Sequence, residues 1–131
     1  MSGAYNNPQT AYQQIAVGTA TPEKLLIMLF SGQIKFLRQA EQALKEKKYE
    51  EAHNLLLKAG DIITELNMTL DLEAGGELAA NLRALYQFYH GEIIKANTNK
   101  DPSYLGPVIA FFESFRETWV EAAKKVRLGA K

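Results

Sequence analysis

The sequence of 131 residues contains no cysteine. This absence excludes a disulfide framework, a thiolate metal site and a thiol nucleophile, and it is typical of a reducing compartment such as the cytoplasm. A surplus of either charge is also missing, because 15 Lys and Arg residues balance 15 Asp and Glu residues. The chain therefore has no global field that would hold a nucleic-acid backbone or an anionic membrane, and we expect neither as a partner.

Long hydrophobic runs are absent too. The longest, Leu25 to Phe30, is far shorter than the roughly 20 residues that span a bilayer. The opening MSGAYNNPQT has neither the basic cluster nor the apolar segment of a signal peptide. We therefore expect no direct membrane insertion and no signal-directed secretion, and a chain of this length is expected to bury one core.

Charged side chains are missing from residues 1–22, which mix Gly, Asn, Gln, Thr and Pro with scattered apolar residues. This composition predicts a flexible, extended tail over residues 1–20, and the charged, helix-forming composition that follows predicts one helical-bundle domain over residues 21–131. About 15 extended residues reach roughly 50 Å, further than the roughly 30 Å of a 20-residue helix. The tail can therefore lie along a whole groove, and our hypothesis is that Tyr12, Ile15 and Val17 contact that groove until a partner displaces them.

Four segments carry apolar residues at helical spacing, and no strand-like alternation competes with them. Links of roughly 4 to 8 residues between long helices favour antiparallel neighbours. The expected fold is therefore all-α, an antiparallel up-and-down four-helix bundle with an extended N-terminal tail. The expected helices run from about Thr21 to Lys45, from near Tyr49 to the break DLEAGG at residues 71–76, from about Glu77 to Ala96, and onward from a start between Pro102 and Pro107.

The first expected helix has more apolar surface than one neighbouring helix covers. Such a surplus usually marks a partner-binding surface, although an antiparallel bundle also buries two sides of each helix, so both interpretations stay open. One stripe comprises Leu26, Leu29, Phe30, Gln33, Leu37, Ala40 and Leu44, and the second comprises Leu25, Met28, Gly32 and Phe36. The inner face of the third helix is expected to comprise Leu78, Leu82, Leu85, Tyr86, Tyr89, Ile93 and Ala96.

Catalytic and metal-binding patterns are sparse. A di-iron bundle needs Glu-x-x-His pairs on two helices, but only Glu50 and His53 have this spacing, and His90 follows Gln87 instead of a carboxylate. No GxSxG, phosphate-binding loop or dinucleotide fingerprint is present. We therefore expect no enzyme activity, no metal and no cofactor. Two alternatives remain open, namely a homodimeric helical adaptor and, less favoured, a metal-binding four-helix-bundle enzyme.

Several blocks together resemble a known family. They are AYQQIAVGTATPEKLLIMLFSGQIKFLRQA, KAGDIITELNMTLDLEAGGELAANLRALYQFY, KANTNKDPSYLGPV and ETWVEAAKK, and they cover nearly the whole chain in register. The sequence is similar to the flagellin-specific export chaperones of the bacterial flagellum, the FliS family. The resemblance implies a small helical-bundle chaperone of the bacterial cytosol that binds the disordered C-terminal segment of flagellin, prevents premature polymerisation and delivers the subunit to the flagellar type III export gate.

The resemblance also implies partners and site residues. Tyr12 matches the family's N-terminal tyrosine, so we expect it to dock on the cytoplasmic domain of the export gate. Other flagellar regulators are further candidate partners, and a homodimer is an option for the protein without its client. From the matching tail positions and the helical phase of the first helix, the expected flagellin-groove residues are Leu25, Met28, Leu29, Phe36, Ile15 and Val17.

Overall fold

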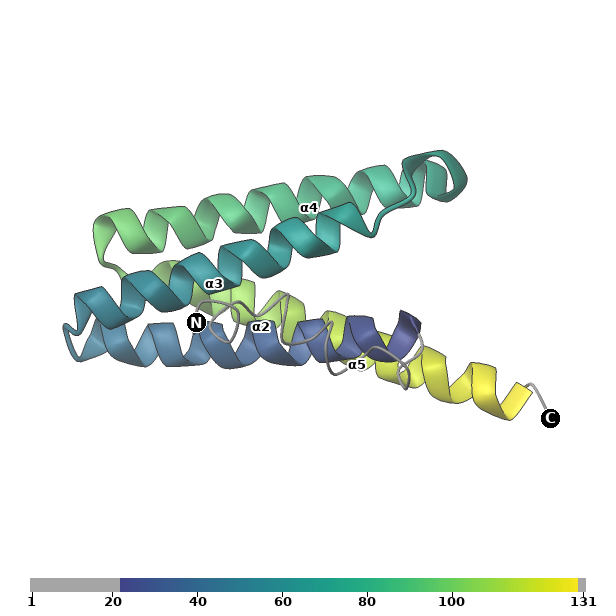
Figure 1. The fold of residues 1–131 in the computed structure, drawn as a ribbon, viewed down its shortest axis with the longest axis horizontal. Coiled ribbons are helices and arrows are strands. Elements are labelled where there is room, and N and C mark those ends of the chain that lie inside the picture. The colour runs from purple at the N-terminus through teal and green to yellow at the C-terminus, as the bar shows by residue number, and fades with distance from the viewer. Residues whose placement is uncertain (1–21, 130–131) are drawn as a thin grey trace, which may run out of the picture.

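The computed structural model describes residues 22–129, which form four α-helices and one short 3₁₀ helix. Successive long helices run antiparallel (Figure 1), and no strand occurs within that range. The predicted up-and-down four-helix bundle is therefore confirmed, whereas the predicted tail and Thr21 lie outside the described residues. The elements are α2 (Pro22–Lys45), α3 (Tyr49–Met68), α4 (Leu72–Asn99), η2 (Pro102–Tyr104) and α5 (Leu105–Gly129).

The four helices are not packed equally closely. α2 lies against both α3 and α5, while α4 packs on α3 and makes only sparse contact with α5. Arg38 of α2 donates to Glu113 of α5, and Arg116 Nε of α5 donates to Ser31 Oγ of α2 at 2.8 Å. Figure 1 shows the α3–α4 hairpin diverging from the α2–α5 pair toward the turn that joins α3 to α4. One flank of α4 is consequently left without a close neighbour.

The predicted restart of the third helix at about Glu77 coincides with a kink, because the non-helical Gly76 separates one short helical turn from the rest of α4. α4 begins at Leu72 because the Asp71 carboxylate caps it, accepting hydrogen bonds from the backbone N–H groups of Glu73 and Ala74 at 3.1 and 3.0 Å. The predicted break at the glycine pair is present inside this helix, since Gly76 has φ 55° and ψ −131° and kinks it. A side chain rarely adopts this backbone conformation, which explains why glycine occupies the kink.

The boundaries around the fourth helix follow from another aspartate cap. α4 continues to Asn99, three residues beyond the predicted end, and Lys100 then adopts the left-handed conformation with φ 56°. Asp101 accepts from Ser103 N–H at 2.9 Å and starts the 3₁₀ turn η2, so α5 begins at Leu105. Pro107 lies in the first turn of α5, where the missing N–H has no helical partner to lose.

The core confirms most of the predicted stripes but corrects two positions of the third helix. Leu78 and Leu85, which were expected on its inner face, are 76% and 41% exposed. The physical reason is the divergence of α4 from α5, which leaves this flank of α4 uncovered. The largest fully buried side chains are Phe30, Phe112, Leu29, Leu37, Leu56, Ile62, Ile63, Leu66, Leu105, Gln33 and Val108.

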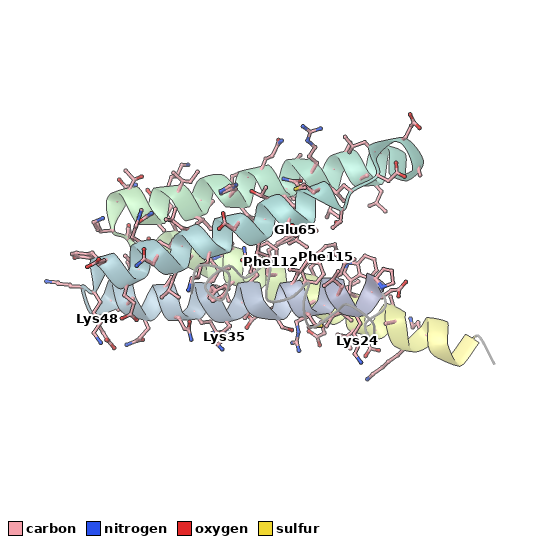
Figure 2. The ribbon with its side chains drawn as sticks, viewed as in Figure 1. Lys24, Lys35, Lys48, Glu65, Phe112 and Phe115 are labelled. Carbon is pink, nitrogen blue, oxygen red and sulfur yellow. The ribbon has the colours of Figure 1, made fainter. Side chains whose placement is uncertain are left out.

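Aromatic rings fill the space where the two helix pairs begin to separate. Phe112 and Phe115 lie there in Figure 2, and both rings approach Phe30 of α2, with centroid distances of 6.4 and 5.3 Å. Tyr86 of α4 stacks on Phe112 at 6.4 Å. This ring cluster connects the α2–α5 pair to the middle of α4.

Gln33 is an exception inside this core. Its side chain is fully buried, and neither its Nε2 nor its Oε1 atom has a hydrogen-bond partner. A buried amide without partners costs free energy, because it gives up hydrogen bonds to water without replacing them. The residue therefore opposes folding at a position where the helical pattern places a core side chain.

Replacing Gln33 with methionine, which has a similar volume, is expected to raise the free energy of unfolding by about 1–2 kcal/mol, because the desolvation cost of the amide disappears. Urea unfolding measures this change. The matched control is Gln42→Met, because the Gln42 amide is exposed and donates to Glu46 at 2.6 Å, and a change within about 0.5 kcal/mol is expected there. A less stable Gln33→Met variant would contradict the interpretation.

Burial raises the pKa of the Tyr86 hydroxyl above its ordinary value of 10.0. Since the pKa in the folded state exceeds that in the unfolded state, the contribution of Tyr86 to stability is complete below pH 10 and is lost as the pH rises above it. Relative to Tyr86→Phe, the natural protein should lose up to about 1.4 kcal/mol of unfolding free energy per pH unit there. Denaturant titrations between pH 9 and pH 11.5 measure the free energy of unfolding of both proteins. If it changes with pH equally in the natural protein and in Tyr86→Phe, this expectation is refuted.

Candidate protein-binding surfaces

Exposed large apolar side chains are concentrated on the α3–α4 hairpin. Several exceed half exposure, and Met68 and Leu78 reach 73% and 76%. Clusters of exposed apolar side chains lower the solubility of a protein, and in soluble proteins they usually mark a surface that binds a partner. Among the residues that the structure describes, the exposed large apolar side chains are Tyr49, Leu57, Met68, Leu72, Leu78, Leu85, Phe88 and Ile94.

On α4, exposed Leu85 and Phe88 lie one helical turn apart, and Phe88 begins a row of aromatic rings in edge-to-face and stacked contact. We call Phe88, Tyr89, Phe111, Phe115 and Trp119 the aromatic row. Consecutive rings in it lie 5.2, 4.5, 5.5 and 6.4 Å apart between centroids. Apart from exposed Phe88, the members of the row are half-buried. The row joins α4 to α5 along a surface that is apolar and still reached by solvent.

The opposite flank of α4 meets α3 closely. His90 lies over Gly60 so tightly that a Cβ at Gly60 would be 2.9 Å from His90 Nε2. Nearby, His53 Nδ1 and Asn97 Nδ2 are 2.9 Å apart across the same seam. A hollow of about 120 Å³ lies between the helices here, with exposed Leu57 and Ile94 among its lining residues.

A second hollow, of about 250 Å³, lies where α3 turns into α4, and we call it the turn hollow. Asn67 lines it, and the Oδ1 atom of this residue is buried without a hydrogen-bond partner. Met68, Leu70 and Leu72 supply apolar surface to it. Besides Asn67, its polar groups come from Thr64, Arg83 and Gln87. The full lining is Thr64, Asn67, Met68, Leu70, Leu72, Arg83 and Gln87.

The groove residues expected on the first helix have different environments. Leu29 is only 2% exposed and belongs to the core, because it lies on the stripe that faces the other helices. Leu25 and Met28 are half-buried, and Met28 lines a shallow hollow of about 230 Å³. Phe36 packs against the core, with the Lys58 ammonium 5.7 Å from its ring centroid. The three expected tail residues, Tyr12, Ile15 and Val17, lie outside the described residues.

The sequence interpretation missed the exposed residues of α4. A signal for them existed, because apolar residues stand side by side at 88–89 and 93–94, which widens the stripe beyond one helix face. His53 and His90 both lie at the α3–α4 seam, where they contact Asn97 and Gly60, respectively, and they do not form one common site. Residues 22–129 contain no group of three or more His, Cys, Asp or Glu side chains arranged to hold a metal ion. Within the same range no helix combines the length and apolarity needed to cross a membrane.

The tight α3–α4 seam predicts different effects at two helical glycines. Gly91→Ala should raise the free energy of unfolding by about 0.5–1 kcal/mol, because a Cβ there meets nothing within 4 Å and alanine favours helix. Gly60→Ala should be about 1–2 kcal/mol less favourable than Gly91→Ala, because His90 must move. Chemical denaturation measures both changes.

A His90→Ala background is the control for this comparison. Without the imidazole ring, Gly60→Ala should recover most of the stability difference, since the obstructing atom is gone. Equal effects of the two glycine substitutions in the natural background would show that the seam is looser than the structure indicates.

A family model described as "Flagellar protein FliS" matches residues 4–126. The flagellar secretion chaperone FliS of Bacillus subtilis is 40% identical over 124 residues, which cover 95% of this chain and 92% of that protein. FliSB of Pseudomonas aeruginosa is 37% identical over 112 residues, covering 82% and 89%. FliS of Vibrio cholerae is 34% identical over 113 residues, covering 83% of each.

Proposed function

The chain belongs to the FliS family of flagellar secretion chaperones, and we propose that it binds the disordered C-terminal segment of flagellin in apolar grooves of its bundle. Bound client is prevented from polymerising too early and is delivered to the flagellar type III export gate. Members of this family are chaperones and not enzymes. The proposed activity accordingly consists of binding and release alone.

The observation that carries this proposal is the set of exposed apolar side chains on the α3–α4 hairpin. Phe88 and Leu78 are 57% and 76% exposed on α4, and Leu57 is 52% exposed on α3. A disordered client pays ordering entropy when it binds, so it needs a large apolar contact area to offset that cost. Side chains spread along two long helices offer such an area to a client that wraps around them.

The α2 surface is a second part of the proposed groove. Leu25, Met28 and Phe36 are half-buried there, so a client segment can add contacts to them without opening the core. Leu29 is fully covered and supports this surface from beneath. In the tail of residues 1–20, Ile15 and Val17 are proposed to occupy the groove before the client does, and Tyr12 is proposed to dock on the export gate. Residues 21–131 are proposed as the single client-binding domain.

The proposed location is the bacterial cytosol, where flagellin is made and where the cytoplasmic domain of the export gate is reached. The absence of cysteine from the sequence supports a reducing compartment. Further flagellar regulators are proposed as partners that share the apolar surfaces. Self-association through the same side chains is the competing use of these surfaces when no client is present.

A peptide of about 40 residues from the flagellin C-terminus of the same species tests the proposal by calorimetry and circular dichroism. We expect one peptide per chaperone, a gain in helicity and a negative heat-capacity change, because a disordered segment folds against apolar surface. Phe88→Ala should weaken binding by about 10-fold, equivalent to about 1.4 kcal/mol, since it removes an exposed ring.

Lys95→Ala is the matched control on the same helix. Lys95 forms an exposed ion pair with Glu92 at 3.2 Å, and such pairs contribute little to stability. We expect its affinity for the peptide to equal that of the natural protein. Absence of peptide binding by a folded, monodisperse protein would refute the flagellin proposal, and a stable dimer under those conditions would favour self-association as the role of the apolar face.

A further inference from the structure

A shallow hollow of about 440 Å³ between α2 and α5 is surrounded by positive charge, and we call it the basic hollow. Lys35 and Arg38 of α2 and Arg116 of α5 line it, and all three side chains are exposed. No Asp or Glu is among the described residues that line it, which are Ser31, Ile34, Lys35, Arg38, Gln39 and Arg116. Figure 2 shows Lys35 on the side of α2 that faces away from α3 and α4. The basic hollow therefore lies apart from the exposed apolar side chains of the α3–α4 hairpin.

The chain neutralises only part of this positive charge. Arg38 donates to Glu113 of α5, so one carboxylate stands against three cations. Arg116 Nε donates to the neutral hydroxyl of Ser31 at 2.8 Å. Within residues 22–129, the Lys35 ammonium forms no ion pair. Since 15 basic residues balance 15 acidic ones in the whole sequence, this surplus is local, and it attracts a partner of the opposite charge.

The two guanidinium groups of the basic hollow are held in place by the bundle itself. Glu113 orients Arg38, and Ser31 orients Arg116. A side chain that is already ordered loses less conformational entropy when it binds a partner. Guanidinium groups also bind carboxylates through two parallel hydrogen bonds, and Arg116 carries further N–H donors beside the Nε that bonds Ser31. The hollow is therefore suited to carboxylate groups.

Ile34 adds an apolar part to the basic hollow. Its side chain is half-buried and packs against the core, so an apolar side chain of a partner can cover it without disturbing the bundle. A nucleic-acid strand would find no aromatic side chain in the lining on which to stack a base. Helices that lie on membranes insert large exposed apolar side chains, whereas the apolar residue of this lining is half-buried. Carboxylates grouped around an apolar side chain, as on an amphipathic protein segment, fit the hollow best.

The spacing of the cations favours a helix as the docked segment. Lys35 and Arg38 are three residues apart on α2, about 4.5 Å along the helix axis. Carboxylates three or four residues apart on a second helix repeat that spacing. A helix also satisfies most of its own backbone groups, so it does not need the acceptors that cationic side chains lack. Lys24 lies about three turns before Lys35 on the same side of α2 (Figure 2), so positive charge continues along the path of such a helix.

We propose that the basic hollow docks an acidic amphipathic helix of a second partner protein. Carboxylates of that helix pair with Lys35, Arg38 and Arg116, and one of its apolar side chains covers Ile34. The proposal does not depend on the flagellin proposal, because it uses the outer surface of the α2–α5 pair and not the α3–α4 hairpin. A chaperone whose hairpin is occupied by a client keeps this surface for a different protein.

A designed helical peptide of about 20 residues, with glutamates at helical spacing around one leucine, is the probe. Fluorescence anisotropy of the labelled peptide should show saturable binding of one peptide per chaperone. Affinity should fall about 10-fold when the salt concentration rises from about 50 to about 200 mM, because screening weakens exposed ion pairs. A scrambled peptide of the same composition should bind about 10-fold more weakly, since its carboxylates no longer share one face. Equal affinities of the two peptides would overturn the proposal.

Lys35→Glu tests the place of binding, and Lys95→Glu on α4 is its matched control with the same change in net charge. Lys35→Glu should weaken binding of the designed peptide about 10-fold, because it puts a repelling carboxylate at the basic hollow. Lys95→Glu should leave the affinity within about 2-fold of that of the natural protein, because Lys95 is exposed on another helix. Both lysines are exposed, so the midpoint of urea unfolding should change little in either variant. Equal losses of affinity would show attraction by net charge alone, and the inference would be wrong.

A charge swap tests the proposed pairing directly. Among peptides in which one glutamate is replaced by lysine, one should restore binding to Lys35→Glu to within about 2-fold of the original affinity. If no position restores it, the helix does not pair with Lys35 and the inference is wrong. It is also wrong if an oligonucleotide or vesicles of anionic lipid bind more tightly than the peptide and lose that binding in Lys35→Glu. Flagellin peptide is absent from these measurements, so their failure leaves the proposed function intact.

Discussion

The close packing of α2 on both α3 and α5 is the contact on which the rest of this molecule depends. Nearly all the large buried side chains come from these three helices, with Phe30 and Phe112 among the largest of them. Helix α4 buries only Ala79, Tyr86, Ile93 and Ala96. Because apolar burial provides most of the free energy of folding, the α2–α3–α5 core can keep the fold while α4 leaves much of its apolar surface in water.

This unequal distribution of burial leaves apolar surface on α4 available to the proposed client. A bundle whose four helices were equally closed would have no apolar area left for a wrapping client. Here the side chains of Leu78 and Phe88 remain exposed without weakening the core, because the core does not include them. The same division lets the proposed client add contacts on α3, α4 and the half-buried side of α2 without opening the core.

The sequence was sufficient to predict the helices and most of the core, because apolar residues that recur every 3.6 residues mark the buried face of a helix. The second helix shows this period at Ala52, Leu56, Ala59, Ile63 and Leu66. It was insufficient for Leu78 and Leu85, because periodicity shows which face of a helix is apolar but not how far away the neighbouring helix lies. The two glycines indicated the break at residue 76, but the sequence pattern did not indicate the single helical turn that the Asp71 cap starts before it. The environment of Asn67 was likewise beyond prediction, because an unpaired oxygen is a property of three-dimensional contacts.

The aromatic row has one further consequence, which concerns light rather than binding energy. Trp119 is the only tryptophan of the sequence, and its half-buried indole meets Phe115 at the end of the row. Its fluorescence can therefore be excited selectively and comes from a single, known place on the surface of α5, beside Phe115. A molecule that covers this surface changes the polarity around the indole, so the protein carries its own optical sensor for the time course of events on that flank.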